Sequence, residues 1–406
     1  MAYREYIEKG PMPSREHMQQ FLRKQIKFKR RHEFVDLYHA VDKIAAEDIK
    51  AQTILPKLPV SKMDGIGVKF SDFLNGLPDT STWREGREFI FANTGCVVPF
   101  AYDTVILIEN VRFNDGKLQI LEAPTKKGQL IDPPGSLIGE NEIIVHKNER
   151  ITPPLLGLLA SAGVKQVKII AKPKIVFLPT GDELVSWQMS DYPANKNVES
   201  NSMMLWGFAQ RYQADLTIYP IIPDDKTKIE EALAKAAQEA DIILINAGSS
   251  KGTKDFTLDL LETKGKVFVY ELGCRPGKHS SFSEFEHKPV LGIAGPPNGA
   301  ELAMRFYLQT IINAYYNQQD KSVPTVKAIV DFQFTAPSNA DFCLQVHLSN
   351  QKGNYHVQKI NPKAVTRSTL LHDYNGFIYL NKTCSLKIGD IVEVELLIDK
   401  KDIPNA

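Results

Sequence analysis

Two apolar segments, Ile175-Val176-Phe177-Leu178 and Ile242-Ile243-Leu244-Ile245, decide the fold of this 406-residue chain. Each is a continuous run of the kind buried on both faces of a parallel sheet, whereas a half-exposed strand alternates apolar and polar residues. Between them, Thr227 to Ala240 repeats apolar residues at intervals of four, which predicts an amphipathic helix that begins near Asp225. Two further apolar runs predict strands: 267–270 and 290–293. The pattern predicts an α/β domain with a parallel sheet covered by helices on both sides.

Glycine-containing loops follow three of these strands, at Pro179 to Glu183, Asn246 to Gly252 and Ala294 to Asn298. They fall on the carboxyl edge of the predicted sheet, where open α/β sheets bind ligands. The middle loop combines small residues, hydroxyls and one ammonium, so its backbone N–H groups can approach a phosphate closely. An ordinary strand-to-helix turn is the alternative. The loop is not a P-loop, because it lacks the Gly-Lys-Ser/Thr ending.

Acidic residues recur in short turns after apolar runs. They are Asp64, Asp182, Glu183, Asp224, Asp225 and Asp255. Carboxylates repeated at turns indicate a site for hydrated metal and oxyanion chemistry. Simpler roles are open for each of them, because acidic residues also make turns and cap helices. Asp64 precedes a glycine, and Asp224 or Asp225 is suited to cap the helix that follows.

Composition restricts the class of protein. The 49 basic and 48 acidic residues nearly cancel, so no global field recruits nucleic acid or a membrane. Nothing resembles a spanning segment or a secretory signal, and we expect a cytoplasmic location. The four cysteines have no paired spacing, which argues against a structural zinc site or a disulfide framework. We expect them to be reduced and mostly buried. They are Cys96, Cys274, Cys343 and Cys384.

The two ends of the chain differ in composition from the middle. Basic residues from Arg15 to Arg31 surround an apolar stripe, which predicts a helix whose charged face is solvated or binds an acidic partner. After residue 325, β-rich runs separated by turn residues predict a small all-β module. These runs are Val326 to Phe334, Phe342 to Leu348, Gly376 to Leu380 and Ile391 to Leu397.

Five motifs occur in an order that resembles the MoeA-type molybdopterin molybdenumtransferases. The motifs are Leu58-Pro59 through Met63-Asp64-Gly65, Thr94-Gly95 with Glu109, Pro179-Thr180-Gly181-Asp182-Glu183-Leu184, the loop from Gly248 to Asp255, and Arg275-Pro276-Gly277-Lys278. The resemblance extends over almost the whole chain. It implies a multidomain α/β plus β subunit that assembles as a homodimer.

The resemblance also implies a division of the chain into four parts. The expected parts are an elongated N-terminal domain formed by 1–50 and 141–173, a β-rich domain at 51–140, a MogA-like α/β molybdopterin-binding domain at 174–322, and a C-terminal β domain at 323–406. Asp64 and Thr94 lie in the β-rich domain. A MogA-type adenylyltransferase and molybdoenzyme acceptors are the implied partners besides the second subunit.

The reaction implied by the resemblance inserts molybdate into adenylylated molybdopterin, cleaves the phosphoanhydride and releases AMP. Two dianions must approach each other, and a divalent cation relieves their repulsion, so Mg²⁺ is expected. The resemblance assigns catalytic roles to Asp64, Thr94, Glu183 and Asp255. It assigns cation binding to Asp224, Asp255 and Glu183. It assigns substrate binding to Gly248, Ser250, Lys251, Gly252, Arg275, Lys278 and Pro297.

Several segments depart from the family pattern. The usual Leu-Pro-Gly-Asn-Pro turn is here Ile293-Ala294-Gly295-Pro296-Pro297-Asn298, and the usual Gly-Glu-Asp segment is replaced by Asp132 to Ser136. Glu199 stands where an aspartate is typical. A second hypothesis therefore stays open beside the enzyme, namely a non-catalytic carrier, regulator or scaffold with the same fold. Retention of the carboxylates favours the enzyme, and the altered turn favours the alternative.

Overall fold

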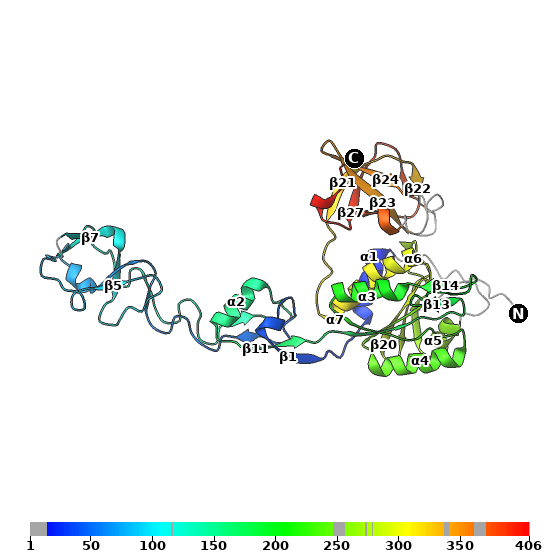
Figure 1. Cartoon of the computed structure of the whole chain (residues 1–406), viewed down its shortest axis with the longest axis horizontal. Coiled ribbons are helices and arrows are strands. Elements are labelled where there is room, and N and C mark those ends of the chain that lie inside the picture. The colour runs from blue at the N-terminus through cyan, green and yellow to red at the C-terminus, as the bar shows by residue number, and fades with distance from the viewer. Residues whose placement is uncertain are drawn as a thin grey trace. The chain divides into compact units, whose positions relative to one another are not determined.

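The chain is described as a computed structural model covering residues 14–114, 117–246, 256–272, 274–277, 279–336, 341–360 and 371–405 (Figure 1). It divides into two compact units. One unit is His32–Ala171, and the other contains the described residues up to Arg31 together with those from Lys172 onward.

The α/β domain has a six-stranded sheet in the second of these units. In spatial order its strands are β15 (Asp215–Ile218), β12 (Lys174–Leu178), β16 (Ile242–Asn246), β20 (Lys288–Ile293), β19 (Ser281–Phe285) and β17 (Lys266–Val269). The first four are mutually parallel, which confirms the predicted parallel sheet. Strand β19 runs antiparallel to both of its neighbours, β20 and β17, an arrangement that the sequence did not predict. The reason is that β19 reads Ser-Phe-Ser-Glu-Phe and so lacks a continuous apolar run.

Helices cover both faces of this sheet, as predicted (Figure 1). On one face, α4 (Lys226–Glu239) and α5 (Phe256–Lys264) bury Ile229, Leu233 and Leu260 against apolar residues of β12 and β16. Burial of a large aliphatic side chain of this kind contributes about 1.5–3 kcal/mol. The other face carries α1 (Arg15–Gln25), α3 (Asn201–Arg211) and the continuous segment formed by α6 (Pro297–Leu302), the π-helix η4 (Ala303–Leu308) and α7 (Gln309–Tyr315).

The basic segment near the N-terminus combines exposed lysines with arginines that bond within the chain. Its helix α1 packs against η4 and α7, in the same compact unit as the α/β domain. Met18 and Leu22 are fully buried there. Lys24, Lys27 and Lys29 are exposed, as predicted for a solvated charged face, whereas the arginines bond within the chain. Arg15 pairs with Glu395, and Arg30 donates to the Tyr315 carbonyl at 2.5 Å.

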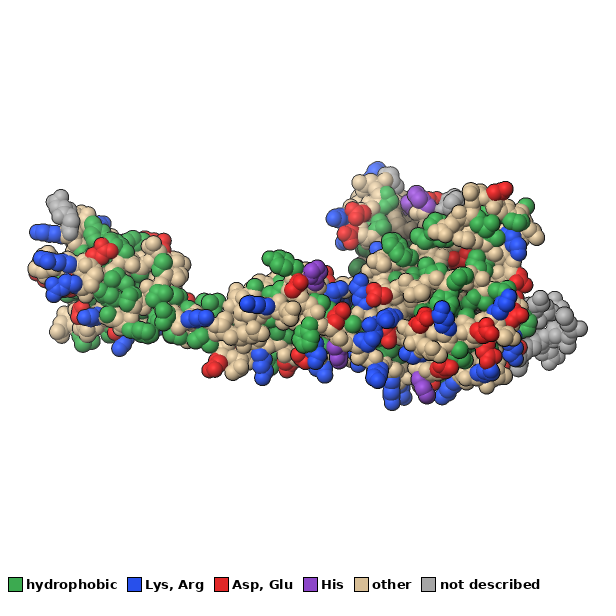
Figure 2. Space-filling model, turned by 60° about the horizontal axis from the view of Figure 1, so that its bottom comes forward, with side chains coloured by type: hydrophobic (Ala, Val, Ile, Leu, Met, Phe, Trp, Pro, Cys, Tyr) green, Lys and Arg blue, Asp and Glu red, His purple; other side chains and the backbone are tan. Residues whose placement is uncertain are grey.

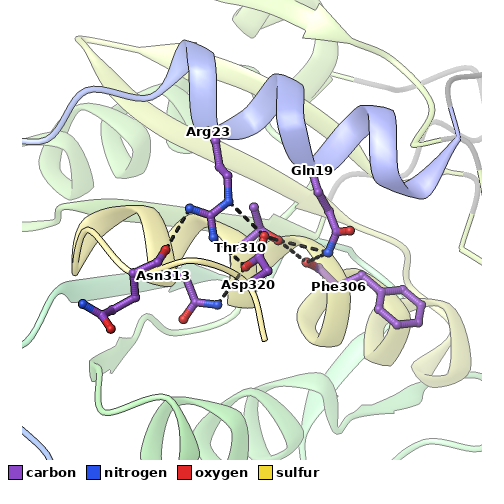
Figure 3. Close-up of polar contacts among 7 residues, drawn as sticks. Gln19, Arg23, Phe306, Thr310, Asn313 and Asp320 are labelled. Atoms are coloured by element: carbon purple, nitrogen blue, oxygen red, sulfur yellow. Dashed lines mark hydrogen bonds and ion pairs between the residues drawn. The ribbon is translucent and has the colours of Figure 1, made fainter. Parts of the chain in front are cut away.

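A polar row on α1 holds the helix in place (Figure 3). Gln19 Nε2 donates to the Phe306 carbonyl at 3.3 Å and to Thr310 Oγ1 at 3.1 Å. Arg23 Nε donates to Asp320 Oδ2 at 2.9 Å, and its Nη1 donates to the Gln318 carbonyl at 2.8 Å. The carbonyl bonded by Gln19 lies in the π-helical turn, where the regular hydrogen-bond ladder is interrupted. The Gln19 side chain therefore joins α1 to the π-helical segment η4 by hydrogen bonds.

Arg23→Ala should lower the free energy of unfolding by about 1–3 kcal/mol, because the partly buried Asp320 carboxylate loses its cation. Urea denaturation measures this change. Lys24→Ala is the matched control, since Lys24 is exposed on the same helix, and we expect a change within about 0.5 kcal/mol. Equal effects of the two substitutions would show that the ion pair contributes nothing.

In the unit His32–Ala171, one part is built from strands that are distant in sequence. Strand β1 (His32–Asp36) pairs antiparallel with β11 (Gln166–Ile170), and β2 (Ile49–Lys50) pairs with β10 (Ile143–Val145). Helix α2 (Pro153–Ser161) adds Leu159 to the shared core. This pairing brings residues 32–50 together with residues 143–170.

The β-rich part of the same unit is made of short antiparallel strands. They are β3 (Val60–Ser61) with β9 (Ile131–Asp132), β4 (Gly65–Val68) between β5 (Ile90–Ala92) and β6 (Thr104–Leu107), and β7 (Val111–Asn114) with β8 (Lys117–Ile120). Ile66, Val68 and Ile106 form the core. A Cβ atom at Gly65 would lie 1.9 Å from the Ile106 carbonyl oxygen, so only glycine allows β4 to begin directly after Asp64.

The predicted C-terminal β module is present and includes one strand of the α/β domain. Its sheet order is β18 (Cys274–Arg275), β23 (Asp341–Gln351), β24 (Asn354–Lys359), β21 (Thr325–Val330), β27 (Ile391–Leu396) and β25 (Gly376–Leu380), with β25 also paired to β23. A second, two-stranded sheet joins β22 (Phe334–Thr335) to β26 (Ser385–Leu386). Val346, Val357 and Val394 are fully buried in the core.

All four cysteines are free thiols, as expected, but only half of them are buried. Cys274 and Cys343 are buried, whereas Cys96 and Cys384 are exposed, so the expectation of mostly buried cysteines was wrong. Basic and acidic side chains alternate over the visible face of the α/β domain, in line with the nearly balanced charge (Figure 2). Within the described ranges, every helix is too short or too polar to cross a bilayer.

Candidate functional site

The carboxyl edge of the parallel sheet carries the loops that the sequence analysis selected. Strands β12, β16 and β20 end level with one another, because Leu178 pairs with Ile245 and Ile245 pairs with Gly292. Thr180, just after β12, donates its hydroxyl to the Asn246 carbonyl at 2.6 Å. The prediction that these loops share one edge is therefore confirmed for their described residues.

Two carboxylates from separate loops are drawn together at this edge. The Asp182 N–H donates to Asp224 Oδ2 at 3.4 Å, and the Asp224 N–H donates to Asp182 Oδ1 at 3.2 Å. Asp225, and not Asp224, caps α4, since its Oδ1 accepts from the Lys228 N–H at 3.0 Å. Asp224 is thus available for the site, and its neighbour Asp182 is one of the turn carboxylates to which the family resemblance gave no role.

Glu183 lies beside this pair on an exposed turn. No helix follows it, because the chain enters β13 (Leu184–Ser186), which pairs with β14 (Asn197–Glu199), so the capping alternative for Asp182 and Glu183 does not hold. The Glu183 carboxylate lies against Gly181, where a Cβ atom would come within 2.6 Å of Oε2. Gly181 has φ 143°, a conformation that favours glycine. The turn therefore depends on Gly181 to place the Glu183 carboxylate.

Arg275 and Pro297 lie on two segments whose backbones touch. A Cβ atom at Gly277 would fall 2.7 Å from the Gly299 carbonyl oxygen, and one at Gly299 would fall 2.9 Å from Gly277 Cα. This close approach holds the loop after β18 against the first turn of α6. The Nε atom of Arg275 is buried and has no hydrogen-bond partner among the described residues. A buried guanidinium donor of this kind is suited to an oxyanion.

Two buried asparagines complete the described part of the edge, and the sequence analysis assigned neither of them. Asn201, at the start of α3, donates to the Gly295 carbonyl at 3.0 Å. Within the described ranges, the buried side-chain oxygens of Asn201 and Asn246 have no hydrogen-bond partner. A polar residue that ends an apolar run, as Asn246 ends β16, was the available signal in the sequence.

Several predicted site residues lie outside the described residues. They are Gly248, Ser250, Lys251, Gly252, Asp255 and Lys278. Within the described part of the chain, no three His, Cys, Asp or Glu side chains form a group that could hold a metal ion. Of the three predicted cation ligands, Glu183 and Asp224 are described, and both lie on loops at the same edge.

Asp64 and Thr94 form a separate contact in the unit His32–Ala171. Asp64 Oδ1 accepts from the Thr94 N–H at 2.7 Å and from its hydroxyl at 2.9 Å. These two bonds, the backbone bond first, hold the pKa of the exposed Asp64 carboxyl below its usual value. Asp64 therefore does more than make a local turn, because it joins two loops that are 30 residues apart in sequence.

The fold and these sites define a class of protein: a multidomain chain whose α/β domain carries a pair of carboxylates at the carboxyl edge of its parallel sheet. Residues 176–314 match the model of a family described as a probable molybdopterin binding domain. Residues 12–163 match the model described as the MoeA N-terminal region, domains I and II. The chain belongs to the MoeA family.

Individual relatives agree with this assignment. The chain is 27% identical over 387 residues to a molybdopterin molybdenumtransferase of Haemophilus influenzae, which covers 91% of this chain and 95% of that protein. It is 24% identical to the protein of the same name from Bacillus subtilis, over 90% of each. The crystal structure of a molybdopterin biosynthesis MoeA protein from Pyrococcus horikosii has the same fold, with a TM-score of 0.76, 22% identity and coverage of 95% and 99%.

Proposed function

We propose that this chain is a molybdopterin molybdenumtransferase of molybdenum cofactor biosynthesis, which inserts molybdate into adenylylated molybdopterin and releases AMP. The single observation that carries the proposal is the pair of carboxylates Asp182 and Asp224, which exchange hydrogen bonds at the carboxyl edge of the parallel sheet. Relatives named molybdopterin molybdenumtransferase match the chain over nine-tenths of its length, which supports the same activity.

Both reactants of the proposed reaction are negatively charged, so their mutual repulsion must be reduced at the carboxyl edge of the sheet. A phosphoanhydride and a molybdate dianion about 5 Å apart repel strongly wherever water is excluded. The buried Nε of Arg275 offers one planar donor to an oxyanion, and Lys278 would add a second positive charge. These two side chains would hold the anions, while the acidic residues would bind a cation.

The Asp182 and Asp224 carboxylates fit part of a magnesium site. Mg²⁺ prefers oxygen ligands and is commonly held by one or two carboxylates together with waters and substrate phosphates. Each of these carboxylates uses one oxygen to accept the other residue's N–H. Asp255 and Glu183 would supply further oxygens. The cation, when bound, neutralises phosphate charge and polarises the phosphorus.

The remaining roles belong to the chain's own side chains. Glu183 and Asp64 would orient molybdate or exchange protons with it, and Thr94 would donate a hydrogen bond to an oxyanion. Asp64 is suited to accept protons only weakly, because the Thr94 contacts stabilise its charged form. The homodimer, a MogA-type adenylyltransferase that supplies the substrate, and molybdoenzyme acceptors are part of the same proposal.

The purified protein should release AMP from adenylylated molybdopterin only when molybdate and Mg²⁺ are both present. A chelator should abolish the release, and added Mg²⁺ should restore it, because the carboxylates alone would repel the substrate phosphates. Chromatographic quantification of AMP measures this. Asp224→Asn and Asp255→Asn should each raise the Mg²⁺ concentration needed for half-maximal rate, whereas Asp225→Asn, at the helix cap, should not. Release unaffected by chelation would contradict the cation part of the proposal.

A carrier that binds the pterin without turnover is the second candidate. The observation that favours it is the departure at Ala294 to Asn298, where Pro296 precedes α6 and Pro297 begins it. Two successive prolines remove two backbone donors from the turn. Tight binding of adenylylated molybdopterin without AMP release under any metal condition would establish the carrier and exclude the enzyme.

A further inference from the structure

The C-terminal β domain contacts both of the segments that carry Arg275 and Pro297. Strand β18 pairs in parallel with β23, with Cys274 opposite Asp341 and Arg275 opposite Phe342. The loop after β18 then rests on α6 through the contact between Gly277 and Gly299. A shift of the C-terminal domain would therefore move the arginine loop directly.

A second connection reaches α6 itself through Glu301, four residues after Pro297. Its side chain is only 5% exposed, although it carries a carboxylate. It accepts a hydrogen bond from Arg305 Nη2 at 2.7 Å on the same helical segment and one from the hydroxyl of Tyr374 in the C-terminal domain. Burial raises the pKa of the Tyr374 hydroxyl, so it remains a donor to the carboxylate.

Aromatic rings from two domains enclose this ion pair. The Arg305 guanidinium lies 5.3 Å from the ring centre of Phe208 on α3 and 5.9 Å from that of Phe377 on β25. The rings of Tyr374 and Phe377 lie 5.4 Å apart. The buried Glu301 carboxylate is held in one geometry by Arg305 and Tyr374. If it lost either hydrogen bond, part of its charge would be unpaired in an apolar environment, which is unfavourable.

We propose that Glu301 and Tyr374 are a positioning pair, through which the C-terminal β domain holds α6 and the Arg275 loop in place against the reactants. This inference rests on the proposed function for its kinetic consequence, but its structural part stands on the contacts. Neither residue touches the reacting atoms. Their effect reaches the site through the Gly277 and Gly299 contact and through the start of α6.

Tyr374→Phe tests the pair, because it removes one hydroxyl and keeps the ring beside Phe377. Hydrogen exchange read by mass spectrometry should become faster in peptides covering 274–277 and 297–302, with the thermal midpoint nearly unchanged. The half-saturating concentration of adenylylated molybdopterin for AMP release should rise about three- to tenfold. Glu301→Gln should shift both measurements in the same direction, because it removes the charge that Arg305 pairs with.

His356→Gln is the matched control, since it alters the contact between His356 Nδ1 and Asp331 Oδ1, 3.0 Å apart and inside the C-terminal domain. We expect it to leave exchange at 274–277 and 297–302 as in the wild type. Unchanged exchange in Tyr374→Phe would overturn the positioning pair, and so would faster exchange spread through the whole C-terminal domain. If the wild type releases no AMP, the proposed enzymatic activity is rejected. The hydrogen-exchange measurement still tests whether Glu301 and Tyr374 position α6 and the Arg275 loop.

Discussion

Asp64→Asn should reduce molybdate-dependent AMP release by about 100-fold or more. The substitution keeps the size and the hydrogen bonds of the side chain but removes the negative charge that the Thr94 contacts stabilise. Removal of a group that transfers a proton or orients a reactant typically costs about 10²–10⁴ in rate. Single-turnover measurement of AMP formation at saturating substrate gives this change without interference from product release.

The control for Asp64 is Asp79→Asn, which changes a carboxylate of the same kind. Asp79 is also exposed, and the Ser81 N–H donates to its Oδ1 at 2.9 Å and holds its pKa below the usual value. It lies outside the proposed site, so its substitution should leave the rate unchanged. Thr94→Val should have a smaller effect than Asp64→Asn, because the Thr94 backbone N–H remains. A rate in Asp64→Asn equal to that of Asp79→Asn would remove Asp64 from the mechanism.

Gly277→Ala should also reduce AMP release by about 100-fold, through displacement of the Arg275 loop. Gly277 has φ 99°, and its new methyl group would lie 2.7 Å from the Gly299 carbonyl oxygen. The backbone of one segment must therefore move away from the other. A misplacement of about 1 Å in a positioning group can cost 10²-fold in rate. The rate of AMP release and its dependence on molybdate concentration measure the effect.

Gly353→Ala separates the clash from the backbone strain. Gly353 has φ 92°, similar to Gly277, but a Cβ atom there would meet nothing within 4 Å. It lies in the turn between β23 and β24, away from the sheet edge. We expect a stability loss of about 1 kcal/mol from the positive φ and no loss of activity. Equal loss of activity in both variants would indicate that strain, and not the contact with Gly299, is responsible.

Much of the α/β domain was predictable because its signals are local. Buried parallel strands require continuous apolar residues, and Ile175 to Leu178 and Ile242 to Ile245 have them. Asp225 begins α4 because its side chain caps the backbone three residues on, an interaction within one turn of chain. The carboxyl-edge position of Thr180 and Asn246 then followed from the handedness and order of the crossovers.

Other features depended on partners far away in the sequence. The antiparallel strand β19 has three polar residues among its five, so it contains no continuous apolar run, and its place is set by pairing with β20. Asp182 joins the site only because Asp224, 42 residues later, exchanges hydrogen bonds with it. The position of Gly277 beside Gly299 is likewise a property of two packed segments.

By itself, the amino-acid order determined the α/β domain, the C-terminal β module and the loops that carry the carboxylates, since each depends on neighbouring residues along the chain. Only the tertiary structure decided that the arginines of α1 serve the fold. Arg15 and Arg23 meet Glu395 and Asp320, which lie hundreds of residues away. A charged side chain is solvated unless a partner reaches it, and long-range packing alone brings that partner close.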